Sequence, residues 1–292
     1  MLRATVLGLL AGATGCATLP QGQLRPQVVA SLETFDYREL DGVLRDYVDE
    51  VGRVDYARLQ TQPEALDDFL DAVASVGPMR RPDLFPTVDH QLAFYLNAYN
   101  SLAIRNVIHR YPYEGLTSLG AQLTFFILTK VQVDGQQLDL NHLEHQIIRP
   151  YVNHTYRARG EGSKAARIHM ALNCVSASCP VLPAEAFVPE RLDAQLDRET
   201  RKFVMEPRNV RVLEDRGVVL LSKIFEWFRE DLVDDAGQPL SPIAWINLYR
   251  EPGTKLDTQL DIAYRDYDWS LNDVTAQRPG VTKPLAPTKY ER

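Results

Sequence analysis

The sequence feature that constrains the fold most is the segment 89–111, DHQLAFYLNAYNSLAIRNVIHRY, which suits one long helix with apolar side chains around most of its circumference. Such a helix has to be surrounded by other elements, so we expect it to be the central buried helix. Asn97 and Asn100 lie one turn apart in its middle, and a buried amide without partners costs roughly 1–3 kcal/mol. Both amides must therefore be bonded, either to tie down neighbouring loops or to orient groups in a cleft.

Shorter periodic segments predict the elements that cover this helix. Apolar residues at helical spacing indicate helices over 37–51, 64–76 and 185–205. Alternating apolar residues around turns with glycine predict two β-hairpins, one over 131–140 and one over 210–221. We also expect a short strand at 167–172. The predicted fold class is α+β, a single helix-rich domain with short β-hairpins packed on a central buried helix.

The start of the chain is typical of an exported protein. An apolar stretch from Ala4 to Ala13 is too short to span a bilayer, and the small residues Thr14 and Gly15 precede Cys16. The segment Ala13-Thr14-Gly15-Cys16 resembles a bacterial lipoprotein processing box. We expect a signal peptide at 1–15 and a lipid on Cys16, which would anchor the protein at the outer membrane, facing the periplasm. The alternative is an ordinary signal peptide in which Cys16 has no special role.

The rest of the chain is expected to follow a simple domain plan. Residues 16–31 would form a lipidated N-terminus and flexible stalk, residues 32–273 the folded domain, and residues 274–292 a disordered, proline-rich tail. The chain has 39 acidic and 32 basic residues, a net charge of −7, and no long basic run, which disfavours nucleic acid as a partner. It has neither a phosphate-binding glycine loop nor a dinucleotide fingerprint, so no cofactor is expected.

Chemically reactive side chains are concentrated in the segment 167–180, RIHMALNCVSASCP. Three hypotheses compete for its two cysteines. Cys174 or Cys179 is a nucleophile activated by His145 or His169. Alternatively, the two cysteines form a disulfide that closes a small loop. In the third hypothesis, the weakest, they bind zinc together with histidines.

A second polar group is expected on the helix after the first hairpin. Asn141 is predicted to cap this helix. At helical spacing Leu140, Leu143 and Ile147 form one stripe, whereas His142, His145 and Arg149 cluster on nearly the opposite side and face water or a cleft.

Five blocks of the sequence, taken in order, resemble the bacterial and plant family called domain of unknown function 547. They are FYLNAYNSLAI, VDGQQLDLNHLEHQIIRP, IHMALNCVSASCP, LLSKIFEWFRED and YRDYDWSLN. The resemblance covers about 32–273. The family has no securely assigned activity. The resemblance implies that its characteristic positions are Asn97, Asn100, His145, Arg149, Asn173, Cys174, Ser178, Cys179 and Pro180.

The working hypothesis is a thiol-dependent hydrolase or acyl-transfer enzyme acting on a peptide, glycan or acyl substrate. Its predicted catalytic residues are Cys174, Cys179, His145, His169 and Asn100. Its predicted substrate-binding residues are Arg149, Asn97, Asn173, Ser176 and Ser178, and no metal site is expected. The alternative hypothesis is a non-catalytic envelope binding or scaffold domain in which Cys174 and Cys179 are structural.

Overall fold

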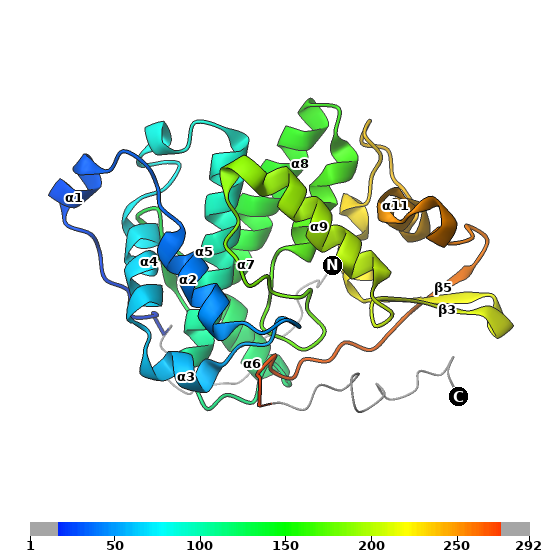
Figure 1. Ribbon diagram of the computed structural model, residues 1–292, viewed down its shortest axis with the longest axis horizontal. Coiled ribbons are helices and arrows are strands. Elements are labelled where there is room, and N and C mark those ends of the chain that lie inside the picture. The colour runs from blue at the N-terminus through cyan, green and yellow to red at the C-terminus, as the bar shows by residue number, and fades with distance from the viewer. Residues whose placement is uncertain (1–16, 276–292) are drawn as a thin grey trace, which may run out of the picture.

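The computed structural model describes residues 17–275, and helix α5 (Val88–Ile108) runs through the middle of its larger hydrophobic core (Figure 1). Sixteen of its residues are buried. The Thr87 side chain caps its first turn by accepting from the His90 backbone N–H, and Arg105 near its end pairs with Asp67 at 2.6 Å. The predicted central buried helix is therefore confirmed.

Short helices surround α5 and complete the N-terminal part of the fold. The preceding ones are α1 (Pro26–Ser31), α2 (Arg38–Tyr47), α3 (Tyr56–Thr61), α4 (Glu64–Ser75) and the 3-10 helix η1 (Pro82–Leu84). The following ones are α6 (Leu119–Leu123), the π-helix η2 (Thr124–Leu128), α7 (Leu140–His142), the π-helix η3 (Leu143–Ile148), α8 (Arg149–Ala158) and the 3-10 helix η4 (Gly162–Met170).

The first predicted hairpin is formed by β1 (Val131–Val133) and β2 (Gln136–Leu138), which pair antiparallel. The turn residues Asp134 and Gly135 have φ angles of 52° and 73°. This conformation explains why Asp-Gly stands here, because two-residue hairpin turns of this kind need positive φ at both central positions.

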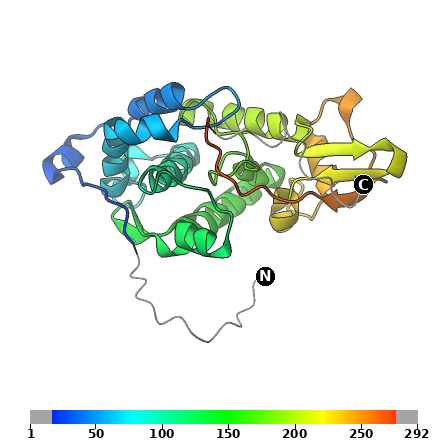
Figure 2. The ribbon, with the colours of Figure 1, turned by 90° about the horizontal axis from the view of Figure 1, so that it is seen from below.

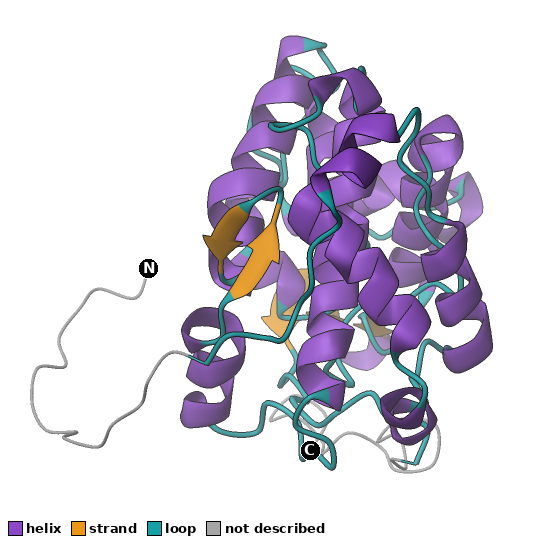
Figure 3. Ribbon diagram, turned by 90° about the vertical axis from the view of Figure 1, so that its left-hand side faces the viewer, coloured by secondary structure: helices purple, strands orange, loops and turns teal. Residues whose placement is uncertain are grey.

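A second, smaller core lies around the C-terminal sheet (Figure 2). β3 (Val210–Leu213) pairs antiparallel with β4 (Val218–Leu221), as predicted, and β5 (Asp261–Tyr264) pairs parallel with β4. The remaining helices are η5 (Pro189–Arg191), α9 (Leu192–Met205), η6 (Glu214–Arg216), α10 (Ile224–Trp227), η7 (Arg229–Asp231), α11 (Pro242–Tyr249) and η8 (Pro252–Thr254). Figure 3 shows that helices predominate and that the strands form two small groups, so the α+β class is confirmed.

Two local predictions are wrong. Residues 167–172 are not a strand but lie in η4 and the turn after it. The reason is Arg167, whose side chain is fully buried and binds Asp193 at 2.7 Å and Asp197 at 2.6 Å. The cap of α7 is Asp139, not Asn141, because the Asp139 carboxylate accepts from the His142 N–H at 2.8 Å.

The segment 17–31 packs against the domain instead of forming the flexible stalk that its composition suggests. Leu19 is 1% exposed. Its N–H donates to the Lys130 carbonyl at 2.8 Å, and the Lys130 N–H donates to the Ala17 carbonyl at 2.7 Å. Burial of this leucine and pairing beside β1 therefore fix the chain. The predicted signal peptide, Cys16 and residues 276–292 of the predicted tail lie outside the described residues.

Within residues 17–275, none of the helices combines the length and apolar character that crossing a bilayer requires.

Candidate functional site

A pocket of about 670 Å³ brings together residues from six separate parts of the chain. One wall is apolar and comes from α6 and η2, with Leu119, Leu123, Phe126 and Ile127. Another part of the lining is aromatic and consists of Trp227, Phe228, Tyr267 and Trp269. The polar groups of the lining include Asn141, Glu144, His145 and His169, and the two cysteines complete it. We call this cavity the aromatic pocket.

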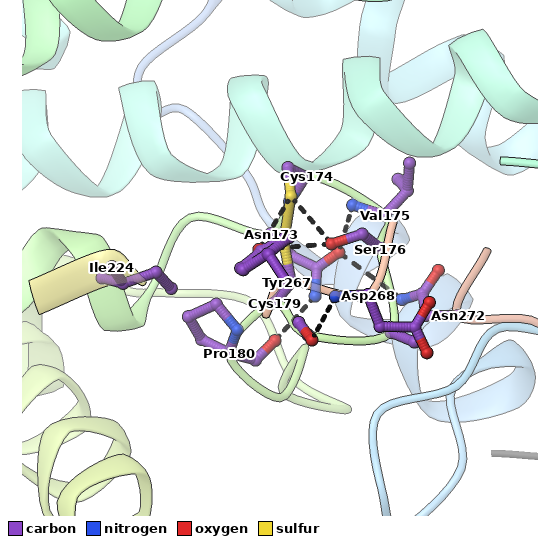
Figure 4. Close-up of a disulfide and its surroundings, with 12 residues drawn as sticks. Asn173, Cys174, Val175, Ser176, Cys179, Pro180, Ile224, Tyr267, Asp268 and Asn272 are labelled. Atoms are coloured by element: carbon purple, nitrogen blue, oxygen red, sulfur yellow. Dashed lines mark hydrogen bonds between the residues drawn. A yellow bond between two sulfur atoms is a disulfide. The ribbon is translucent and has the colours of Figure 1, made fainter. Parts of the chain in front are cut away.

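Cys174 and Cys179 form a disulfide in the lining of the aromatic pocket, with Cα atoms 6.2 Å apart (Figure 4). The Cys174 N–H donates to Cys179 Sγ at 2.9 Å, and the Tyr267 hydroxyl donates to the same sulfur at 3.3 Å. Of the three hypotheses for these cysteines, this arrangement fits the disulfide. Within residues 17–275, no group of three His, Cys, Asp or Glu side chains that could hold a metal ion is present.

The loop that carries the disulfide is held in place from within by Asn173. Asn173 Oδ1 accepts from the Val175 N–H at 2.8 Å, and Asn173 Nδ2 donates to the Pro180 carbonyl at 2.8 Å. Val175 has a φ of 63°, which is uncommon for a β-branched residue. Both bonds of Asn173 therefore support a strained turn.

The C-terminal segment fastens the same loop from outside. Ser178 Oγ accepts from the Asp268 N–H at 2.9 Å, and the Ala177 N–H donates to the Ser270 carbonyl at 2.7 Å. Figure 4 shows Asp268 and Asn272 beside the disulfide loop. Ser178 thus holds the C-terminal segment around Asp268, which brings Tyr267 and Trp269 to the pocket.

The amides on α5 bind backbone groups of two loops. Asn100 donates to the Ala171 carbonyl at 2.9 Å and accepts from the Asn173 N–H at 2.8 Å. Asn97 donates to the Phe187 carbonyl at 2.7 Å and accepts from the Phe187 N–H at 3.0 Å. Both amides therefore tie down loops, one of the two roles that the sequence allows, and Asn100 holds the entry to the cysteine loop.

A charged network centred on Asp231 holds the two imidazoles of the pocket lining, His145 and His169. The Asp231 carboxylate accepts from His169 Nε2 at 2.7 Å and from Arg149 Nε at 2.9 Å on one oxygen, and from Asn153 Nδ2 at 2.9 Å on the other. Burial alone would raise the pKa of Asp231, but the bonds from His169 and Arg149 outweigh it and hold that pKa well below its usual range. Asp231 is therefore ionised.

The bonds of this network fix how the two imidazoles are protonated. Arg149 can only donate, so His145 Nδ1, 3.0 Å from an Arg149 nitrogen, is an acceptor. Burial lowers the pKa of His145, which agrees with a neutral ring whose Nε2–H is a donor. His169 stacks on Phe228 with ring centroids 3.7 Å apart, and its bond to Asp231 makes Nε2 the protonated nitrogen.

Comparison with known families finds a match for the part of the chain that carries most of this site. Residues 86–204 match the family model described as "Protein of unknown function, DUF547". This segment of the chain, which is less than half of its 292 residues, is similar to the DUF547 family. A search of curated proteins and a search of solved structures both found no match.

The DUF547 segment contributes the loop-holding amides, the disulfide and both imidazoles, but it ends before the aromatic wall. The predicted meeting of the cysteine loop with His145 and His169 is present, because all four residues line one pocket. The sulfurs themselves contact Ser176, Tyr267 and the Cys174 N–H.

Sequence reasoning missed the residues that complete this site. Asp231 ends the quoted block LLSKIFEWFRED, yet nothing in that block shows that its carboxylate reaches His169. Trp227 and Phe228 also line the pocket, and Trp227 is 45% exposed. The signal for these pocket residues in the sequence was a pair of adjacent aromatic residues next to acidic residues on a short helix.

Proposed function

We propose that this protein is a non-catalytic binding domain of the bacterial envelope, and that its aromatic pocket holds an acyl chain with an uncharged, hydrogen-bonding head. The observation that carries this proposal is a pocket of about 670 Å³ with apolar and aromatic walls and a few polar groups. This volume lies within the range of about 300–1,000 Å³ that is usual for small-molecule sites, and their linings have the same character.

The charges around the pocket favour an uncharged head over a carboxylate. Glu144 contributes a carboxylate to the lining, whereas His145 is neutral. The charge of Arg149 is balanced by Asp231 at 2.9 Å. A hydroxyl or amide head can donate to Glu144 and accept from the His145 Nε2–H, but a carboxylate head would face the charge of Glu144.

The disulfide supports the binding role over the thiol-dependent enzyme, because a thiolate is the nucleophile in such chemistry. Here each sulfur is bonded to the other. The enzyme remains the second candidate for a reduced form, since both sulfurs line the same pocket as two imidazoles. Counting free thiols in the native Cys16→Ser variant, whose only cysteines are Cys174 and Cys179, separates the two. No free thiol supports binding, whereas selective alkylation of one thiol that is abolished by His145→Ala supports the enzyme.

The envelope location rests on the leader and on Cys16. It is tested by labelling cells with a radioactive fatty acid. Label on the wild-type protein that is lost in Cys16→Ser supports a lipid anchor, and unlabelled wild-type protein argues against it.

Ligand binding is tested by titrating dodecanol against a fluorescent acyl probe. Trp227→Ala removes an exposed part of the aromatic wall, and we expect its affinity to fall by about tenfold or more. Leu248→Ala is the matched control, because Leu248 is 50% exposed, close to the 45% of Trp227, and does not line the pocket. Equal affinities for the wild-type protein and Trp227→Ala would refute the proposal.

A further inference from the structure

The mouth of the aromatic pocket carries a concentration of exposed apolar side chains. Leu119 is 83% exposed, Leu123 48%, Trp227 45% and Ile127 42%, and all four line the pocket. We call these four residues the apolar rim. Leu119, Leu123 and Ile127 follow one another at intervals of four, and α6 buries none of its residues. Exposed apolar patches of this kind mark surfaces that bind a partner or a membrane.

The chain enters the domain close to this rim. The Ala17 carbonyl accepts from the Lys130 N–H at 2.7 Å, and Thr18 pairs with Lys130 as a β-bridge. Lys130 follows Ile127 by three residues and its ammonium donates to the Ile127 carbonyl at 3.1 Å. Ala17, the first described residue, therefore lies close to the rim, and Cys16 directly precedes it in the sequence.

The chemistry of the pocket mouth favours an apolar partner over a charged surface. The lining within the described residues contains no lysine or arginine. An anionic surface would need such residues, since attraction to acidic lipids is provided by basic side chains. A neutral bilayer needs only apolar side chains that can enter its interface.

We propose that the apolar rim is a membrane-docking surface. Leu119, Leu123, Ile127 and Trp227 enter the interface of a lipid bilayer, and the aromatic pocket then opens toward the acyl chains. Exchange of an acyl ligand between bilayer and pocket rests on the proposed function, whereas docking itself does not. An anchor at Cys16 would hold the rim at the same surface, because the chain enters beside it.

The test uses the full chain carrying Cys16→Ser, which cannot be lipidated at that position. It is mixed with phosphatidylcholine vesicles whose acyl chains are brominated, and tryptophan quenching is recorded. The three tryptophans are Trp227, Trp245 and Trp269. Trp245 is 0% exposed in the second core and serves as an internal reference. We expect quenching that is largely lost in Trp227→Phe.

Leu119→Gln should require about tenfold more lipid for half-maximal quenching, since it removes one leucine from the membrane contact. Leu248→Gln, an exposed leucine outside the pocket, should behave like the parent. Raising the salt from about 0.1 M to about 1 M, which shortens the screening length from about 10 Å to 3 Å, should not weaken quenching. The leader is the same in every variant, so its own affinity for vesicles cancels in these comparisons.

Equal quenching curves for the parent, Leu119→Gln and Leu248→Gln would overturn the proposal. A second result would also overturn it: vesicles quench none of the variants, and the protein forms a concentration-dependent dimer that Leu119→Gln abolishes. The rim would then bind a second copy of the chain. Dodecanol binding in the absence of vesicles is measured in parallel. If dodecanol does not bind but quenching still depends on Leu119, the docking surface stands and the proposed ligand fails.

Discussion

Replacement of Asn100 by alanine tests whether the central helix supports the pocket through its amide. Asn100 is 5% exposed and makes two hydrogen bonds, to the Ala171 carbonyl and from the Asn173 N–H. The alanine variant leaves both backbone groups buried without a partner. Each such group costs roughly 1–3 kcal/mol, so we expect the free energy of unfolding to fall by about 3 kcal/mol.

Asn97→Ala is the matched control on the same helix. Asn97 is 1% exposed and makes the same pair of bonds, to the carbonyl and from the N–H of Phe187. Its removal should destabilise the protein by a similar amount, about 3 kcal/mol. Phe187, however, does not line the aromatic pocket, whereas Leu172 and Cys174 flank the backbone that Asn100 holds. Only Asn100→Ala should therefore weaken dodecanol binding as well.

Urea unfolding followed by far-ultraviolet circular dichroism gives the stability of both variants, and probe displacement gives their affinity under conditions where each is folded. Two results would refute the reasoning. One is an Asn100→Ala variant as stable as wild type that no longer binds ligand, because the amide would then act on the ligand directly. The other is an equal loss of affinity in both variants.

Two further predictions concern His145 and the disulfide, which both line the pocket. Burial lowers the pKa of His145, so its contribution to stability is fully present above the ordinary pKa of about 6.5 and is lost as the pH falls through the lowered pKa. Urea unfolding between about pH 7.5 and pH 5 should therefore show a decline in the free energy of unfolding that is smaller in His145→Gln than in the wild-type protein. Identical pH dependence in the two proteins would contradict this prediction. The double variant Cys174→Ala with Cys179→Ala removes the bond that closes a loop with a sequence separation of 5. Its free energy of unfolding should fall by about 2 kcal/mol. An unchanged midpoint of urea unfolding would argue against the disulfide.

The sequence predicted the parts of the fold that depend on local pattern. The central helix follows from its apolar circumference, and the first hairpin from Asp134-Gly135, whose positive φ angles few other residue pairs accept. The pair Ser241-Pro242 likewise marks the start of α11 (Pro242–Tyr249), where the Ser241 side chain accepts from the Ala244 N–H. These signals are carried by residues close together in the chain, so the sequence alone is sufficient to show them.

The site was only partly predictable because it depends on contacts across long sequence separations. His169 and Asp231 are 62 residues apart, and Cys179 and Tyr267 are 88 residues apart. The expected strand at 167–172 failed for a related reason, since Arg167 is buried by ion pairs with a helix 26 to 30 residues away. Residue types indicated which groups carry chemistry, but not which of them meet.

The most direct test of the central claim, that the aromatic pocket binds an acyl chain with an uncharged head, is isothermal titration calorimetry with straight-chain alcohols of increasing length and the matching carboxylates. Each added methylene that enters the pocket contributes about 0.8 kcal/mol, or about a fourfold gain in affinity, until the pocket is full. The account predicts this increase, a negative heat-capacity change and weaker binding of each carboxylate than of its alcohol. Affinities that do not depend on chain length, or carboxylates that bind more tightly, would contradict it.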